Sequence, residues 1–438
     1  MRNSNLGGGG IYYNPTNIMK SLLKNITIVV TAAVIATLCA CTNAKAKETE
    51  KSSTAASAQS NATTPTRTLP KGAIAFDYTN HLYFDVVLRD SIPARMVFDT
   101  GNTSILLDEA FYKKHFAHLG NLQKAMAAGA GNAMQAVNLD MSGWKYSVGE
   151  HNQTEQRAVV MDLRKILGDG VDGMFGMAFM RGRKVKFNYT DEYMLILPQE
   201  EQAPEGYTCI KCKWLDNSQT RMLIPIKVKI TDEVSFDGNF LVDMGASTGM
   251  LLNSNLAAKL NLKSVLSNTK KIIYDVAGVG GSATDYIFRA KGVAIAGSEI
   301  NDIRTSYSAN TQGSLADSRY DGLIGNGLLE RFDVIFDFAK CEIWLRPNKN
   351  ISKAAIYHSG IVLTPKNDCW IVNGLVEGGN AEKAGLKRGD VVVSINGLSR
   401  DKVDLKTLKK MSESAEAWKI TVKRGNTTSE ISFEKEKL

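Results

Sequence analysis

Between His81 and Phe98 the chain alternates apolar and polar residues, breaks at a polar turn and then becomes continuously apolar: HLYFDVVLRDSIPARMVF. Alternation with a period of two is typical of a strand with one buried face, and the interrupted pattern predicts a β-hairpin. The triplet Asp-Thr-Gly follows at once, beginning at Asp99. Asp108 then precedes EAFYKKHFAHL and predicts a helix N-cap.

The same order of elements occurs a second time. The stretch RMLIPIKVKITDEVSFDGNFLV, which ends at Val242, again predicts two strands joined by a turn. Asp243 follows it within DMGASTG, and Asn253 then precedes a helix-like segment, SNLAAKLNL. Each half therefore places an aspartate between an apolar strand and a capped helix.

The spacing of later motifs agrees between the halves. A glycine hairpin begins at Gly129 in the first half and at Gly278 in the second. Asp172 of DGMFG follows the first hairpin by 43 residues, and Asp321 of DGLIG follows the second by 43. Both halves close with a strand hairpin, VKFNYTDEYMLILP and VIFDFAKCEIWLRP. An internal duplication explains the shared order and the shared spacing together.

Asp-Thr-Gly on an apolar strand, a glycine hairpin and a later apolar-apolar-Gly strand resemble a lobe of a retropepsin-like aspartic protease. The resemblance covers residues 68–203 and 204–348, so one chain would hold both lobes that retroviral enzymes form by dimerising. It implies a mainly β, two-lobed acid-protease fold that is complete as a monomer, with Asp99 and Asp243 as the catalytic pair. It also implies active-site support from Thr100, Gly101, Asn102, Met244, Gly245 and Ala246, and flaps at Gly129, Ala130, Gly131, Gly278, Val279, Gly280 and Gly281.

The chemistry of such a pair follows from charge repulsion. Two carboxyl groups face to face in a semi-enclosed site cannot both ionise easily, so they share one proton over a wide pH range. The pair can then activate a water molecule and protonate the carbonyl oxygen of a peptide bond. The sequence predicts an aspartic endopeptidase acting on polypeptides, with no cofactor and no metal.

Met244 departs from the family pattern. In the family the residue after each aspartate is Thr or Ser, and its hydroxyl bonds across to the other lobe. Thr100 fits, but the thioether of Met244 cannot make that bond, so half of this inter-lobe contact is expected to be missing. Asn102 also departs from the usual Ser or Ala, whereas Ala246 fits. The alternative is a catalytically inactive, membrane-tethered peptide-binding protein on the same scaffold.

A competing motif overlaps the second aspartate. The stretch GASTG, from Gly245 to Gly249, matches G-x-S-x-G, the nucleophile turn of serine hydrolases. That turn requires alternating α/β units, whereas the surroundings here are strand hairpins and the first half lacks the serine. The glycine hairpins also lack the Gly-Lys-Ser/Thr ending of a phosphate loop. Both alternatives are disfavoured.

From about residue 349 the repeat ends and a third pattern occupies 349–438. The stretch GNAEKAGLKRGDVVVSING resembles a bacterial PDZ domain, which binds extended peptides or peptide C-termini between a strand and a helix. The resemblance implies a carboxylate-binding loop within HSGIV and a groove wall on the following helix. The candidate peptide-binding residues are Gly360, Ile361, Val362, Leu405 and Leu408, although packing in the domain core would equally explain the two leucines.

The N-terminal segment predicts export. Residues 1–40 contain lysines followed by a short apolar run, as in a secretory signal, and the natural start could be Met19. The run ends at LCAC, which resembles a bacterial lipoprotein signal with Cys41 as the lipidated residue. Residues 41–67 then read as a polar, flexible tether. We expect an exported protein, anchored by lipid in the bacterial cell envelope at the outer membrane; a non-cleaved anchor helix is the alternative.

Composition narrows the partners further. The chain of 438 residues has a net charge of +8 and no basic stripe interleaved with aromatic residues, so a nucleic-acid partner is not expected. Cys209 and Cys212 form a single C-x-x-C, which without a second pair favours a structural or thiol role over zinc.

Overall fold

The computed structural model describes residues 27–29, 68–120, 122–167, 170–278, 281–352, 359–366, 369–403, 405–414, 416–436 and 438. Among the predicted functional positions, Cys41, Val279 and Gly280 lie outside these residues. Within the predicted signal segment only Thr27–Val29 is described; it forms β1, parallel to β7 (Gln123–Ala128). No helix in the described part of the chain is long and apolar enough to cross a membrane.

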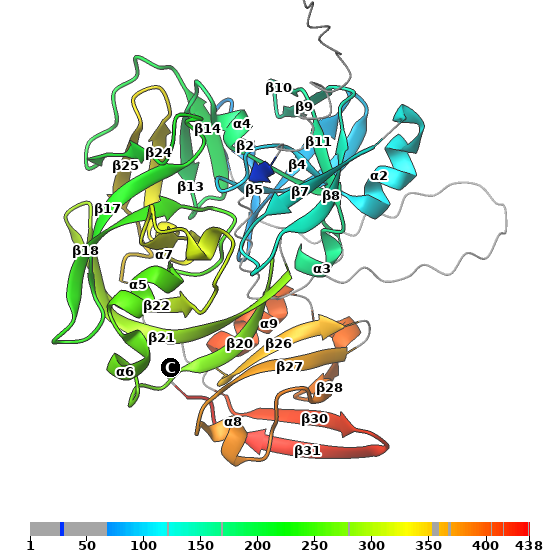
Figure 1. The fold of residues 1–438 in the computed structure, drawn as a ribbon, viewed down its shortest axis with the longest axis vertical. Coiled ribbons are helices and arrows are strands. Elements are labelled where there is room, and N and C mark those ends of the chain that lie inside the picture. The colour runs from blue at the N-terminus through cyan, green and yellow to red at the C-terminus, as the bar shows by residue number, and fades with distance from the viewer. Residues whose placement is uncertain are drawn as a thin grey trace, which may run out of the picture.

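The first lobe is built around the predicted hairpin (Figure 1). Its strands are β3 (Asp77–Tyr78), β4 (Leu82–Leu88), β5 (Ile92–Asp99), β6 (Leu106–Asp108), β7, β8 (Gln135–Asp140), β9 (Trp144–Val148), β10 (His151–Glu155), β11 (Ala158–Met161) and β12 (Gly173–Gly176), and its helices are α2 (Glu109–Phe116), α3 (Arg164–Leu167) and α4 (Met177–Met180). β4 and β5 pair antiparallel, and β12 runs parallel to β5 with Gly176 opposite Asp99. Asp108 caps α2 as predicted, because its side chain accepts the amides of Ala110 and Phe111.

The second lobe repeats this arrangement and confirms the predicted duplication. Its elements are β16 (Lys213–Trp214), β17 (Met222–Lys229), β18 (Ser235–Val242), β19 (Met250–Leu252), α5 (Ser254–Lys259), α6 (Leu262–Val265), β20 (Ile272–Gly278), β21 (Gly281–Ile295), β22 (Ser298–Ser308), β23 (Gly322–Ile324) and α7 (Asn326–Leu329). β23 runs parallel to β18 as β12 does to β5, and Asn253 caps α5. The repeated Asp-Gly has a packing reason: a Cβ built on Gly173 or Gly322 would lie 2.4 or 2.0 Å from a backbone oxygen of the neighbouring strand.

A six-stranded sheet joins the lobes. Its strands, in spatial order, are β15 (Thr208–Lys211), β25 (Glu342–Pro347), β24 (Phe332–Asp337), β13 (Lys184–Asn188), β14 (Tyr193–Leu197) and β2 (Ile74–Ala75). The contact between the lobes is β13 against β24, where Phe187 lies opposite Val334. Phe187, Phe98 and Met244 belong to one apolar core that extends through both lobes. This shared core and sheet fix one lobe against the other.

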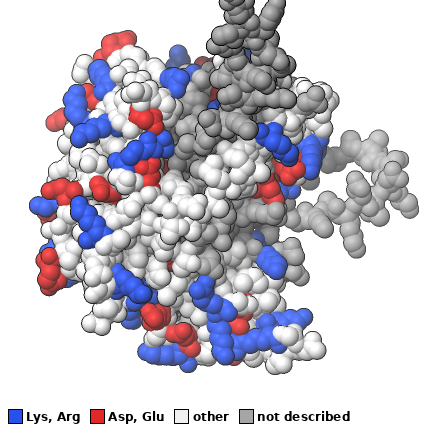
Figure 2. Space-filling view, in the orientation of Figure 1, with Lys and Arg blue, Asp and Glu red and all other residues white. Residues whose placement is uncertain are grey.

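The C-terminal domain packs beside the second lobe (Figure 1). It contains β26 (Ile361–Lys366), β27 (Cys369–Val376), α8 (Asn380–Lys383), β28 (Val391–Ile395), β29 (Leu398–Ser399), α9 (Leu405–Glu413), β30 (Trp418–Arg424) and β31 (Thr427–Phe433). Its own core includes Trp370, Leu408 and Trp418. On the face in Figure 2, basic and acidic side chains are interspersed over the protease lobes. Lys291 and Asp232 form an exposed ion pair at 2.6 Å in the second lobe.

Candidate active site

Asp99 and Asp243 come together at the junction of the two lobes. Asp99 ends β5 and Asp243 follows β18, and neither side chain is exposed. Each Oδ1 accepts the amide of the glycine two residues later, from Gly101 at 2.6 Å and from Gly245 at 2.9 Å. A Cβ on Gly245 would lie 2.3 Å from Cγ of Asp99, so this glycine is required for the approach of the two lobes. The sequence-predicted pair is therefore brought together by matching turns.

The two carboxyl groups have strongly perturbed protonation. Burial raises the pKa of Asp99 to about 6. Burial, and then the negative charge of Asp99, raise the pKa of Asp243 well above its ordinary value. Oδ2 of each aspartate has no partner in the described part of the chain that meets hydrogen-bond geometry. This arrangement favours one proton shared between the two carboxyl groups.

Thr100 makes its half of the inter-lobe contact twice over. Its hydroxyl donates to the carbonyl of Val242 at 2.8 Å and accepts the amide of Met244 at 2.9 Å. The side chain of Met244 is fully buried in the common apolar core, at the position where the family has a hydroxyl-bearing residue. The missing hydroxyl is thus replaced by apolar packing at this position.

Asn326, which the sequence reasoning missed, supplies a second inter-lobe contact. Its Nδ2 donates to the carbonyl of Met244 at 2.7 Å and to that of Asn80 at 3.2 Å. Its Oδ1 accepts the hydroxyl of Tyr189, in the first lobe, at 2.8 Å. The equivalent position after the glycine of the first lobe is Met177, an apolar residue. In the first lobe the polar inter-lobe contact comes from Thr100, after the aspartate, and the position after the later glycine is the apolar Met177. In the second lobe the residue after the aspartate is the apolar Met244, and the contact comes from Asn326, after the later glycine.

His81 is a second residue that the sequence reasoning missed. It is 5 % exposed and hydrogen-bonds the backbone of Gly245, the residue whose amide holds Asp243. Burial lowers the pKa of His81 to about 4, so the imidazole is neutral near pH 7. Asn102 and Ala246, the predicted supporting residues, are also fully buried, and Asn102 Oδ1 accepts the amide of Ser104. Of His81, Asn102 and Ala246, only His81 has a titratable side chain, and it is uncharged near pH 7.

The first flap is closed onto the second lobe. The carbonyl of Gly129 accepts both the amide and the hydroxyl of Ser314, at 3.0 and 2.9 Å. The carbonyl of Ala130 accepts Nδ2 of Asn310 at 2.9 Å, and a Cβ on Gly313 would lie 2.2 Å from the oxygen of Gly131. The predicted flap residues of the first lobe therefore meet a loop of the second, a contact that no local pattern indicates.

The second flap belongs to a sheet that continues into the C-terminal domain. Gly278 lies opposite Gly281 at its tip. At its base β20 pairs with β27, with Ile272 opposite Val376. Lys271 and Glu377 add an ion pair at 3.1 Å beside this junction. The predicted second flap and the C-terminal domain are therefore joined by strand pairing and by an ion pair.

The predicted PDZ residues divide between two surroundings. Gly360 has a positive φ of 80°, as a tight loop requires, and Ile361 and Leu408 pack in the domain core. Val362 points the other way, into an apolar cluster with Ile272 of the second flap and Leu438. Leu405 begins α9. The edge of β26 away from β27 pairs with no strand in the described residues.

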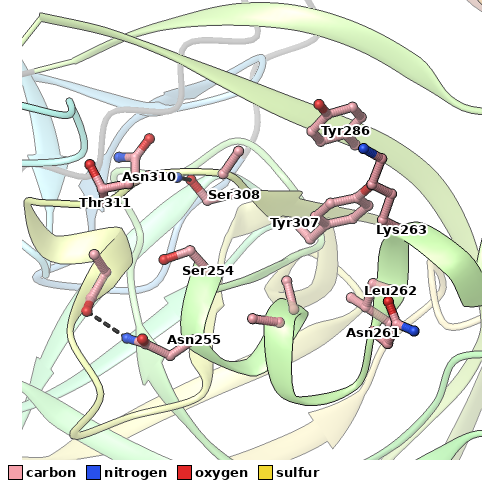
Figure 3. Close-up of a pocket in the computed structure, with 14 residues that line it drawn as sticks. Ser254, Asn255, Asn261, Leu262, Lys263, Tyr286, Tyr307, Ser308, Asn310 and Thr311 are labelled. Carbon is pink, nitrogen blue, oxygen red and sulfur yellow. Dashed lines mark hydrogen bonds between the residues drawn. The ribbon is translucent and has the colours of Figure 1, made fainter.

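A cavity of about 550 Å³ lies elsewhere in the second lobe (Figure 3). Tyr286 and Tyr307 form one wall, with their rings stacked 4.7 Å apart, and α5 forms the other. Neither aspartate of the pair lines it. Asn310 and Thr311 do, so this cavity adjoins the loop that holds the first flap, and it is separate from the paired carboxyl groups.

The two lobes have the arrangement of the acid-protease fold, and a third domain follows them. Residues 84–179 match the aspartyl protease family, and residues 371–416 match the PDZ domain family. The chain thus carries a retropepsin-like aspartyl protease domain and a PDZ domain. Among solved structures it is similar to the aspartic proteinase from Irpex lacteus, with 12% identity, a TM-score of 0.41 and coverage of 65% of this chain and 98% of that one. No curated protein matches the chain in sequence.

Proposed function

We propose that the protein is an aspartic endopeptidase in which Asp99 and Asp243 hydrolyse a peptide bond through an activated water. The observation that carries the proposal is the pair of fully buried carboxyl groups, held by matching glycine amides, with raised pKa values. The ionised carboxylate takes a proton from water as its oxygen attacks the carbonyl carbon. The protonated carboxyl donates to the carbonyl oxygen, and a proton then passes to the leaving nitrogen as the C–N bond breaks.

The PDZ domain would capture and position an extended peptide. The edge of β26 that pairs with no described strand supports this role, because a peptide could add to it as a strand. The pairing of β27 with β20 supports a link to cleavage, because the captured peptide would lie two strands away from the second flap. We further propose export and lipid anchoring through Cys41, which would place this activity at the cell envelope.

The test is a mixed peptide library incubated with the purified protein between pH 4 and 8, with products identified by mass spectrometry. We expect fragments from internal cleavage. Intact peptides that remain bound to a folded protein would instead support the non-catalytic alternative, to which the replacement of a hydroxyl by Met244 points. Lipid attachment at Cys41 is tested separately, by labelling cells with a fatty-acid analogue. The wild-type protein should take up the label, and Cys41→Ser should not.

The pH profile should place the active range near neutrality. Because the pKa of Asp99 is raised to about 6 and that of Asp243 is raised well above its ordinary value, both carboxyl groups become protonated as the pH falls below 6, and the pair then loses its base. We expect kcat/KM to fall about tenfold per pH unit below that point. A carboxyl group whose pKa rises on folding stabilises the folded state more at low pH than at neutral pH. Protonation of the two aspartates therefore does not unfold the protein, and the loss of kcat/KM at low pH reports the loss of the base. A rate maximum near pH 3–4 would contradict the expectation.

A further inference from the structure

Asp285 is a buried carboxylate that the proposed chemistry does not use. It lies on β21 in the second flap, opposite Tyr274 of β20 and Ser308 of β22. It is not exposed at all, and neither Oδ1 nor Oδ2 has a partner that meets hydrogen-bond geometry. Burial raises its pKa to about 7. Ser306, two residues away on the same face of β22, is likewise buried with an unpartnered hydroxyl.

The duplication supplies a matched position in the first lobe. Leu107 and Leu252 are equivalent, because each lies opposite the glycine of the repeated Asp-Gly. Leu107 pairs with Val160, and Leu252 pairs with Tyr307. Met161, which follows Val160, therefore corresponds to Ser308, which follows Tyr307. Continuing the antiparallel register of β8 and β11 by one residue beyond Val160 and Asn138 places Val137 opposite Met161.

Val137 is thus the counterpart of Asp285, and Ala125, which pairs with Val137, is the counterpart of Tyr274. Val137 and Met161 are buried in an apolar cluster, with Ala125 partly buried against it. Apolar residues at these positions are therefore compatible with the fold of a lobe, and only the second lobe has a carboxylate there, that of Asp285.

The position of Asp285 connects it to the active site. Tyr274, its cross-strand neighbour, shares an apolar cluster with Ala246, which follows Gly245, and with Ala130 at the tip of the first flap. Ser308 accepts the amide of Asn310 at 3.2 Å, and Asn310 in turn donates to the carbonyl of Ala130. The two strand neighbours of Asp285 thus connect it to the tip of the first flap and to the turn that follows Asp243.

Within the described residues, no cationic side chain hydrogen-bonds the Asp285 carboxyl group. The nearest arginines along this face are Arg289 on β21 and Arg304, opposite it on β22. Arg289 donates to the backbone carbonyls of Leu438 and Asp302. Burial raises the pKa of Asp285, and the hydroxyl of Ser308 lowers it in part. An ionised carboxylate buried without a counter-ion is costly, and a cation brought to it is held strongly.

We infer that Asp285 is a specificity-determining residue that accepts a lysine or arginine side chain of the polypeptide substrate beneath the second flap. The inference rests on the proposed function for its substrate. The apolar counterpart in the first lobe makes the recognition asymmetric. One side of the cleaved bond presents an apolar side chain to the layer around Val137, and the other presents a cation to Asp285.

The first test compares cleavage of a peptide library by the wild-type protein, by Asp285→Val, which installs the first-lobe residue, and by the similarly shaped Asp285→Asn. We expect the wild type to favour Lys or Arg at one fixed distance from the cleaved bond. The ratio of rates for a Lys peptide and its acetyl-lysine counterpart should fall at least tenfold in both variants. Val137→Asn, the control, should keep the ratio. A wild-type profile without basic enrichment, or an unchanged ratio in Asp285→Val, overturns the inference.

A binding measurement separates this inference from the proposed function. Amidated Lys and acetyl-lysine peptides, which lack the free carboxylate sought by a PDZ domain, are titrated against Asp243→Asn with and without Asp285→Val. We expect at least a tenfold preference for Lys that disappears with Asp285. If the wild type cleaves nothing but this preference is present, the proposed function fails and the inference stands. Equal affinity for both peptides overturns the inference even if cleavage occurs.

Discussion

Asp99→Asn and Asp243→Asn should each reduce kcat by about 10²–10⁴-fold, the usual range for removing a positioned acid or base. An amide can accept the glycine amide that holds each position, but it can neither take a proton from water nor supply one. The fold should survive, because the side chains have the same shape. At neutral pH the unfolding temperature should rise, since a shared proton leaves one buried negative charge that the amide removes. Steady-state rates and thermal unfolding measure the two effects independently.

Asp172→Asn is the matched control for these variants. Asp172 belongs to the repeated Asp-Gly motif and accepts the amide of Arg95 at 2.9 Å, away from the paired carboxyl groups. It should retain wild-type rates. Undiminished cleavage in either Asp99→Asn or Asp243→Asn would remove that aspartate from the mechanism. A loss shared equally by Asp172→Asn would show that the rates report folding.

The parts of this molecule that the sequence predicted are those encoded locally. Period-two alternation gave the hairpins that end at Asp99 and Asp243, and the capping residues Asp108 and Asn253 gave α2 and α5. The duplication added long-range information, because equal spacing in two copies implies equal pairing. It placed two aspartates on matching turns before any contact was known.

The contacts between lobes could not be predicted in the same way. Asn326 and His81 carry no local signal, since an asparagine after a glycine and a histidine before a strand occur in many surface loops. Only tertiary structure brings Asn326 to Tyr189 and His81 to Gly245. The sequence offers one hint of Asn326: Met244 lacks the hydroxyl that would bond across to the first lobe, which implies that another residue makes an inter-lobe contact in its place. Val362 illustrates the same limit: alternation fixes that it faces away from Ile361, but not that the second flap lies there.

Thr100→Val should destabilise the protein by about 2–6 kcal/mol, because it leaves two buried backbone groups unpaired at about 1–3 kcal/mol each. The groups are the carbonyl of Val242 and the amide of Met244. Thr248→Val is the matched control: Thr248 is also buried, but its hydroxyl makes a single bond, to Met250 within its own lobe. We expect a loss of about 1 kcal/mol there. Chemical denaturation of both variants, with kcat measured alongside, tests the difference.

Met244→Thr distinguishes a missing contact from a replaced one. The sequence pattern alone predicts that restoring the hydroxyl raises stability or activity. The structure predicts the opposite, because the side chain of Met244 is fully buried in the common core and Asn326 already holds its carbonyl. Shortening a buried methionine should cost about 1–3 kcal/mol, with no gain in kcat. A more stable Met244→Thr would mean that Asn326 does not compensate. In that case Tyr189→Phe, which removes a partner of Asn326, should have little effect on stability, whereas compensation requires it to weaken the contact between lobes.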